Sequence, residues 1–470
     1  MMLSGNNGIL TRAGEAKEST ERAKEEEAAN LSFTTVQMDL AQGKTVDTVT
    51  FQSIVDGNFG SGNATGTIGG NSYIITVKRT GINYQMDSSG NVVELTELPI
   101  DFAPGVLEGN GTTNDPYVIN SIEDLVAVSY NVNTGNDLYE GKVLSLGRDL
   151  NFQEDASYAN ANAKYKYTSS GCIPDANSTT TIKELMIKTT GNGFTPIGFS
   201  NTSFKGTFDG KGKYLTNLYI KVSGLNGLFG IISTNITIKD LNLNKCNIKG
   251  DQYTGGIAAL NMAANLSISG CTVNGNIESQ QSIAGGIVGF SNGQLLNISH
   301  CSTSGNLTGK KTSGGIVGMG GKVNVLDCHN DAIIISKEAP AGGIIGQGNG
   351  TIEVCYNTGK INSLQAYNGI GGIAGTMDAD SNVFDCNNTG NIGEETSGMN
   401  SGGIVGYGSD KKIKIINCCN SGKILSKNNS GGIIGGNTKA SIKNCYNFGV
   451  VICASSPAGG IIGIRKQYCG

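Results

Sequence analysis

The chain has 470 residues, a mass of 48.6 kDa and a formal net charge of −4. This mildly acidic balance provides no basic surface for a polyanion, so we expect no nucleic-acid partner. Twelve cysteines without a Cys-x-x-Cys pair, and only two histidines, do not match the clustered spacing of a zinc site. We therefore expect neither a metal nor any other cofactor.

The first predicted element is a long helix that begins near residue 11 and ends near Gly43. Residues 11–30 carry ten charges of mixed sign, which is typical of an exposed helix. Phe33, Val36 and Leu40 then recur at helical spacing, so the second half of the helix gains an apolar face.

Short β-branched segments follow this helix. Residues 73–77, 81–84 and 92–95 have strand composition, and residues 87–91 form a turn signal. We therefore expect residues 1–100 to form a helix docked on a small antiparallel sheet.

The start of this region carries a family resemblance. The segment Asn7-Gly8-Ile9-Leu10-Thr11-Arg12-Ala13 resembles the stretch that follows the membrane helix in type IV pilin-like proteins. The resemblance implies the same helix-on-sheet fold and a minor pilin-like subunit. The apolar first half of the pilin helix is missing from the sequence, so we expect a membrane helix upstream in the working protein.

Residues 101–223 are predicted to cap a repeat array and to form its irregular first coils. Ser121-Ile122-Glu123-Asp124 is a capping-box pattern that opens an apolar helix through Val128. Open ends of repeat arrays require such covers.

Residues 224–470 contain an internal repeat. Glycine makes up 71 of 470 residues, about twice the usual share, and many glycines belong to a recurring Gly-Gly-Ile block. The blocks recur with a nearly constant period of about 29 residues, and Gly227 belongs to a degenerate forerunner. The second glycines of the blocks are Gly256, Gly286, Gly315, Gly343, Gly372, Gly403, Gly432 and Gly460.

Each repeat also carries a cysteine, roughly half a period after its glycine pair. Aliphatic residues lie three residues before and six residues after most of these cysteines, within β-branched segments that are too short for helices. This pattern predicts a mainly β protein: a parallel β-helix (solenoid) of about nine coils. The cysteines are Cys246, Cys271, Cys301, Cys328, Cys355, Cys386, Cys418 and Cys445.

The repeat itself resembles a known family. Gly402-Gly403-Ile404-Val405-Gly406, Ile416-Asn417-Cys418 and Val354-Cys355-Tyr356-Asn357-Thr358-Gly359 look like GLUG repeats, and residues 109–125 resemble the segment that precedes such arrays. The resemblance implies a bacterial surface or secreted protein, and hence an extracellular or cell-surface location.

Stacking of equivalent residues predicts the interior. Cysteines at one register form a column of reduced, inward-facing thiols; a disulfide framework is the alternative. The asparagines that follow the cysteines by two residues can stack their amides as a ladder. These are Asn330, Asn357, Asn388, Asn420 and Asn447.

The sequence names no catalytic residue. Asp327 and Asp385 share a register but are separated by the coil of Val354, which sets them about 9.6 Å apart, at the edge of the separation for an inverting glycosidase. His300 and His329 recur with no nucleophile, so we interpret them as corner residues.

We therefore expect a non-catalytic adhesin or display protein that binds a glycan or protein partner. The alternatives are a carbohydrate-active β-helix enzyme, either a polysaccharide lyase or a hydrolase, and the pilin-like subunit. In the last repeat Cys469 follows Gly460 earlier than in the other repeats, and no C-terminal cap is visible. We expect further sequence downstream or self-association through this coil.

Overall fold

The computed structural model describes two compact units, residues 1–107 and 108–470. The regions that we expected at 101–223 and 224–470 thus belong almost entirely to one unit. The described residues are 5–69, 72–77, 83–86, 92–95, 107–135, 138–187, 192–199, 201–338, 340–364, 369–378, 380–394, 399–409, 412–436, 439–456 and 458–464.

The first unit packs two helices on an antiparallel sheet. Helices α1 (Gly5–Ala41) and α2 (Thr48–Phe59) precede a sheet of order β1-β2-β3-β4, which confirms the small N-terminal α/β region. No helix among the described residues is long and apolar enough to cross a membrane. The strands are β1 (Ala64–Gly69), β2 (Ser72–Val77), β3 (Asn83–Met86) and β4 (Val92–Leu95).

Aromatic packing joins α1 to the rest of this unit. Phe33 and Val36 are buried, and the Phe33 ring stacks on Phe51 of α2 with centroids 6.2 Å apart. Leu40 is 43% exposed, contrary to our expectation, because it lies in the last turn of α1 beyond these core residues. α2 and β1 were not predicted, and the predicted turn at 87–91 lies outside the described residues.

The second unit begins with a helix that has the predicted capping box. In α3 (Ile122–Asn133) the Ser121 hydroxyl accepts from the Asp124 N–H at 3.1 Å, and Asp124 Oδ2 accepts from the Ser121 N–H at 2.9 Å. Most residues of this helix are buried, including Leu125 and Val128. Elements without the repeat motif follow: β7 (Leu150–Asn151), a 3-10 turn (Asp155–Ser157), β8 (Tyr165–Thr168), β9 (Gly171–Pro174) and α4 (Ile182–Met186).

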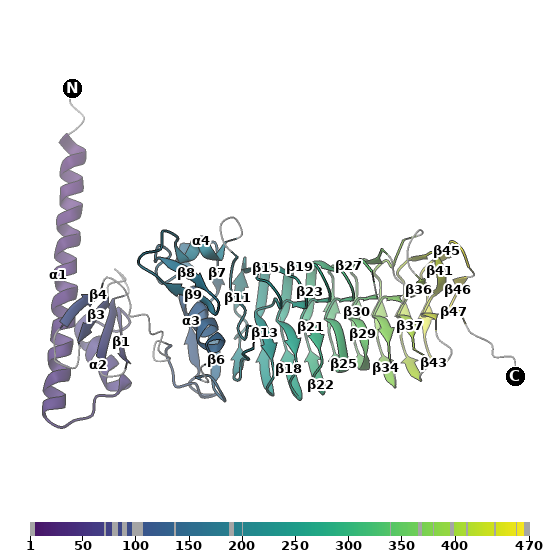
Figure 1. The fold of residues 1–470 in the computed structure, drawn as a ribbon, viewed down its shortest axis with the longest axis horizontal. Coiled ribbons are helices and arrows are strands. Elements are labelled where there is room, and N and C mark those ends of the chain that lie inside the picture. Colours follow the sequence, from purple (N-terminus) through teal and green to yellow (C-terminus); the bar gives the residue numbers. More distant parts are fainter. Residues whose placement is uncertain are drawn as a thin grey trace. The chain divides into compact units, whose positions relative to one another are not determined.

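The rest of this unit is a parallel β-solenoid, which confirms the predicted fold (Figure 1). It has about 11 turns, more than the nine expected, because coils upstream of Gly227 join the stack without a Gly-Gly-Ile block. Each regular coil contributes short strands to four columns.

The first column holds the glycine pairs. Its strands are β16 (Thr254–Gly255), β20 (Ala284–Gly285), β24 (Ser313–Gly314), β28 (Ala341–Gly342), β32 (Ile370–Gly371), β36 (Met399–Gly402), β41 (Asn428–Gly431) and β46 (Ala458–Gly459). Paired strands align the first glycines of successive coils, for example Gly314 with Gly342. The second glycines are also stacked: a Cβ at Gly286 would overlap the carbonyl oxygen of Gly315, so only glycine fits there.

The second column follows each glycine pair. It contains β13 (Phe229–Ile232), β17 (Ala258–Asn261), β21 (Val288–Ser291), β25 (Val317–Leu326), β29 (Ile345–Glu353), β33 (Ala374–Met377), β37 (Val405–Gly408), β42 (Ile434–Gly436) and β47 (Ile462–Ile464).

The third column extends from the cap, and the long strands β25 and β29 also contribute to it. It contains β5 (Tyr117–Ile119), β6 (Val143–Leu146), β10 (Thr207–Asp209), β14 (Ile236–Lys239), β18 (Asn265–Ser269), β22 (Leu295–Ser299), β34 (Ser381–Phe384), β38 (Ile413–Ile416) and β43 (Ala440–Lys443).

The fourth column starts at β7 and lies on the far side of the cysteine corner. It contains β11 (Tyr214–Thr216), β12 (Tyr219–Ile220), β15 (Asn242–Gly250), β19 (Thr272–Ser279), β23 (Ser302–Gly309), β26 (His329–Asn330), β27 (Ile333–Ser336), β30 (Tyr356–Asn357), β31 (Ile361–Ser363), β35 (Asn387–Asn388), β39 (Cys419–Asn420), β40 (Ile424–Ser426), β44 (Tyr446–Asn447) and β45 (Val451–Cys453).

A left-handed backbone corner joins the third and fourth columns in every regular coil. The corner residue directly precedes the buried corner position and has φ between 51° and 62°. Most coils place Asp, Asn, His or Gly there, which tolerate this conformation, but one coil places the β-branched Val354, at φ 55°. The corner residues are Asp240, Gly270, His300, Asp327, Val354, Asp385, Asn417 and Asn444.

We predict that Val354→Asn stabilises the solenoid by about 1 kcal/mol, since asparagine adopts the left-handed conformation at lower cost. Val354 is 44% exposed, so little apolar burial is lost. Urea unfolding measures the change. Asn417→Val, at an equivalent corner, is the reverse variant and should destabilise by at least as much, since it also loses the hydrogen bonds of Asn417 with Asp385 and Asn444. Equal midpoints for all three proteins would contradict the prediction.

Candidate functional site

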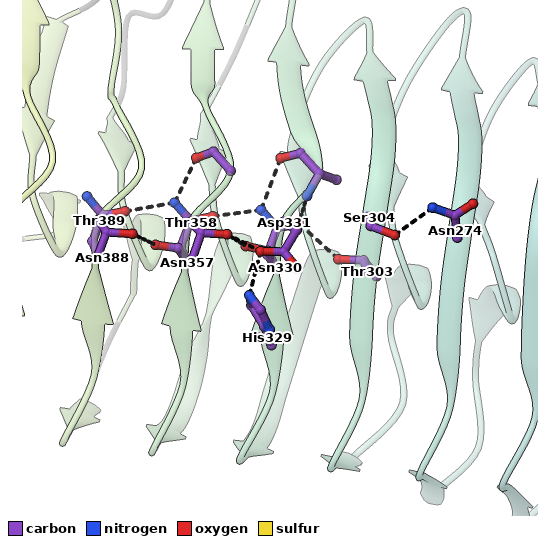
Figure 2. Close-up of polar contacts among 12 residues, drawn as sticks. Asn274, Thr303, Ser304, His329, Asn330, Asp331, Asn357, Thr358, Asn388 and Thr389 are labelled. Atoms are coloured by element: carbon purple, nitrogen blue, oxygen red, sulfur yellow. Dashed lines mark hydrogen bonds and ion pairs between the residues drawn. The ribbon is translucent and has the colours of Figure 1, made fainter.

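Asparagine amides form a continuous hydrogen-bonded ladder inside the solenoid (Figure 2). Asn330 Nδ2 donates to Asn357 Oδ1 at 2.6 Å, and the next bonds, through Asn388 and Asn420 to Asn447, are each 2.7 Å long. The Thr303 hydroxyl starts the chain by donating to Asn330 Oδ1 at 2.9 Å.

The ladder packs against the glycine column. The Asn357 amide lies where a Cβ of Gly343 would be, and Asn388 lies in the same way against Gly372. In the blocks from Gly315 to Gly432, the neighbouring coil and the amide opposite therefore leave no room for a Cβ at the second glycine. In the two coils before the ladder, Val273 and Thr303 fill this space.

We predict that Asn388→Asp destabilises the protein at pH 7 by about 3 kcal/mol or more. The buried Asn388 donates to Asn420 Oδ1 and to the Gly390 carbonyl, and a carboxylate would face both acceptors without a proton.

Burial raises the pKa of such a carboxyl above its unfolded value of about 3.9, so the penalty is complete above the folded pKa and disappears as the pH falls. Urea unfolding of variant and wild type from pH 7 to pH 4 should show that the difference between their free energies of unfolding becomes smaller. Asn388→Ala should lose stability with no such pH dependence, and Asn306→Asp, on the surface, should change stability little. A gap for Asn388→Asp that stays constant with pH would contradict the prediction.

Cysteine thiols form a second interior column. The N–H of Cys328 donates to Cys355 Sγ at 3.4 Å, and the Cys355 thiol donates to the Glu353 carbonyl at 3.2 Å. Each thiol therefore satisfies the backbone at a sharp corner while filling the small space inside it. All eleven cysteines of the described residues are free. The column contains Cys271, Cys301, Cys328, Cys355, Cys386, Cys418 and Cys445.

Two predicted members of the cysteine register differ from the others. Cys445 is only partly buried, because it is the last member of the cysteine column among the described residues. Cys246 is buried but lies outside the column: it pairs with Gly275, and Leu241 occupies the corner position of its coil. The sequence does indicate that Cys246 is different, because Cys246 lies farther from Gly227 than any other cysteine of the register lies from its own glycine pair.

We predict that the native protein exposes few reactive thiols, because the column is buried and its thiols are hydrogen-bonded. After denaturation without reductant, at least six thiols should react with a thiol reagent. A lower count would show that disulfides form.

The sequence-predicted acids and histidines do not form one cluster. Asp327 lies at a corner with Oδ2 3.6 Å from His300 Nε2, whereas Asp385 accepts from Asn417 Nδ2 at 2.9 Å. His329 packs against the Tyr356 ring with centroids 3.9 Å apart and the two planes tilted by 31°. In the part of the chain that the structure describes, no three His, Cys, Asp or Glu side chains are grouped to hold a metal ion.

A groove that the sequence did not reveal lies on the outer face of the fourth column, next to the cap. Its larger part has a volume of about 360 Å³, and a second part of about 220 Å³ shares Asn247 and Asn276 with it. The cap contributes Gln153 and Ile187 to the wall. The remaining lining residues of the larger part are Asn217, Tyr219, Lys245, Cys246, Asn247, Asn274, Gly275 and Asn276.

We call this groove the amide groove, because side-chain amides are the most frequent groups in its lining. Asn306 Nδ2 donates to Asn276 Oδ1 at 3.0 Å, and no described residue accepts a hydrogen bond from the Asn276 amide nitrogen. Asn247 Oδ1 is shielded from solvent and also has no hydrogen-bond partner among the described residues. Among the described residues, an unpartnered amide donor at Asn276 and an unpartnered amide acceptor just beneath the surface at Asn247 therefore lie side by side on neighbouring coils. Burial raises the pKa of Cys246 to about 12, so this thiol is neutral at physiological pH.

A β-bulge shapes the groove. Leu243 pairs with Val273 and Cys246 with Gly275, so β15 has one more residue than β19 between these pairs. Gly275 has φ 152°, and its place directly against the Cys246 backbone leaves no room for a side chain. Bulges bend a strand and redirect its side chains.

No protein-family model matches the chain, so the resemblances to GLUG repeats and pilin-like proteins stay predictions. Halomucin from Haloquadratum walsbyi is 28% identical over 182 residues, which cover 38% of this chain and 2% of halomucin. A solved structure from Bacteroides ovatus, described as a candidate immunoglobulin A1 protease, matches with a TM-score of 0.42 and 18% identity, covering 76% of this chain and 90% of that chain. This chain is thus similar to halomucin along part of its length, and that part is a small fraction of halomucin.

Proposed function

We propose that this protein is a non-catalytic adhesin or display protein that binds a glycan through the amide groove. The observation that carries the proposal is the groove itself, in which an amide donor of Asn276 and an amide acceptor of Asn247, both without a partner among the described residues, lie side by side on neighbouring coils. Sugar hydroxyl groups both donate and accept hydrogen bonds, so neighbouring amides can bind them in pairs.

The solenoid supports a display role. Its coils are joined by backbone hydrogen bonds in one register, and its interior amides and thiols are hydrogen-bonded to neighbouring coils. A groove on such a scaffold needs little reorganisation on binding, which lowers the entropic cost. The extracellular or cell-surface location that we propose rests on the resemblance of the blocks to GLUG repeats.

Glycan-array binding of the full chain tests this function. We expect binding to a defined set of glycans, reduced at least about tenfold by the double variant Asn247→Ala/Asn276→Ala, because two hydrogen-bonding groups are lost. The matched control is Asn297→Ala, which removes a half-buried outward asparagine of β22 that does not line the groove. Absence of glycan binding by the wild type would overturn the proposal, and so would equal losses in the two variants.

A second candidate function is that of a minor pilin-like subunit. The observation that favours it is the first unit, where the 37-residue helix α1 packs with α2 on a four-stranded antiparallel sheet. Immunogold electron microscopy of cells that produce the protein should then find label along surface fibres. Label confined to the cell envelope would argue against this role.

A further inference from the structure

We infer that the amide groove selects an acidic glycan, with the Lys245 ammonium contacting a carboxylate or sulfate group on the sugar chain. This inference rests on the proposed function and adds the ligand class and the residue that determines it.

The first argument is the position of Lys245. It lies in the bulged stretch of β15, where two residues stand opposite one in β19, and it has a left-handed backbone with φ 52°. Lysine rarely adopts this conformation, and unfavourable backbone conformations are concentrated at functional sites. The bulge places an exposed lysine in the wall of the larger part of the groove.

The second argument is charge. Among the described residues that line the larger part, Lys245 is the one charged side chain; the others are amides, apolar groups, a glycine, a tyrosine and a protonated thiol. In the smaller part, Lys249 is paired with Glu278 at 2.9 Å and contributes little net charge. The described lining of the groove therefore carries one uncompensated positive charge.

The third argument is the direction of the groove. Its two parts share Asn247 and Asn276, and the lining continues to Asn306 on the next coil. Successive coils are about 4.8 Å apart, close to the length of one pyranose ring in an extended chain. An oligosaccharide lying parallel to the stack can place its hydroxyl groups on the Asn247, Asn276 and Asn306 amides and an acidic substituent at Lys245.

Two pairs of probes are used. Within each pair, the acidic and the uncharged member distinguish recognition of the charge from recognition of the sugar, and the comparison between the pairs distinguishes a carboxylate from a sulfate. The first pair is an oligogalacturonate and its methyl ester, and the second is a sulfated galactan oligosaccharide and its desulfated form. Isothermal titration of the full chain should show binding of at least one acidic probe that is about tenfold or more tighter than that of its uncharged counterpart, in proportion to one charge-assisted hydrogen bond.

Lys245→Gln should remove this preference while the affinity for the uncharged probe stays within about twofold. Lys322→Gln, which removes an exposed lysine of β25 outside the groove, is the matched control and should leave both affinities unchanged. Rescue of the preference by Lys245→Arg would show that the charge at this position determines it.

Three results would overturn the inference. They are an unchanged preference in Lys245→Gln, an equal loss for charged and uncharged probes, and equally tight Lys245-dependent binding of a polyglutamate peptide. If the wild type binds uncharged glycans through Asn247 and Asn276 but shows no acidic preference, this inference fails and the proposed function stands. If it binds no glycan, the proposed function fails as well.

Discussion

Backbone hydrogen bonding between successive coils is the constraint on which the solenoid depends. Each strand pairs in parallel with its equivalent one coil away, so every position repeats the environment of its predecessor. A residue type that suits one coil then suits the next, and columns of one chemistry result. The glycines show this most directly: from Gly256 to Gly432, each second glycine leaves room for the carbonyl oxygen of the next coil, as Gly315 does for Gly343.

This constraint explains which features the sequence could predict. The columns of Ile268, Ile298 and Ile352, the stacked glycines and the asparagine ladder depend only on register, and the nearly constant spacing of the Gly-Gly-Ile blocks reveals register. The coils near the cap lack the Gly-Gly-Ile block and follow different local sequences, so periodicity undercounted the turns.

The candidate groove depends on departures from register, which is why the sequence concealed it. Leu241 holds the corner position that cysteine occupies in later coils, and one extra residue between Leu243 and Cys246 bulges β15 at the groove. The groove also needs Gln153 and Ile187, which are distant in the sequence and belong to the irregular cap. No repeat pattern connects them to Asn276, so only the folded chain brings these groups together.

The asparagine ladder also gives the solenoid a dipole that is directed along its axis. Every hydrogen bond between side-chain amides from Asn330 to Asn447 has its donor on the earlier coil and its acceptor on the later one. Hydrogen bonds aligned in this way polarise one another. The dipoles therefore add along the stack, and the two ends of the ladder are chemically different: a threonine hydroxyl at Thr303 and an amide N–H at Asn447. A coil that supplies an acceptor can extend this chain at Asn447, whereas two such ends brought face to face would oppose donor to donor.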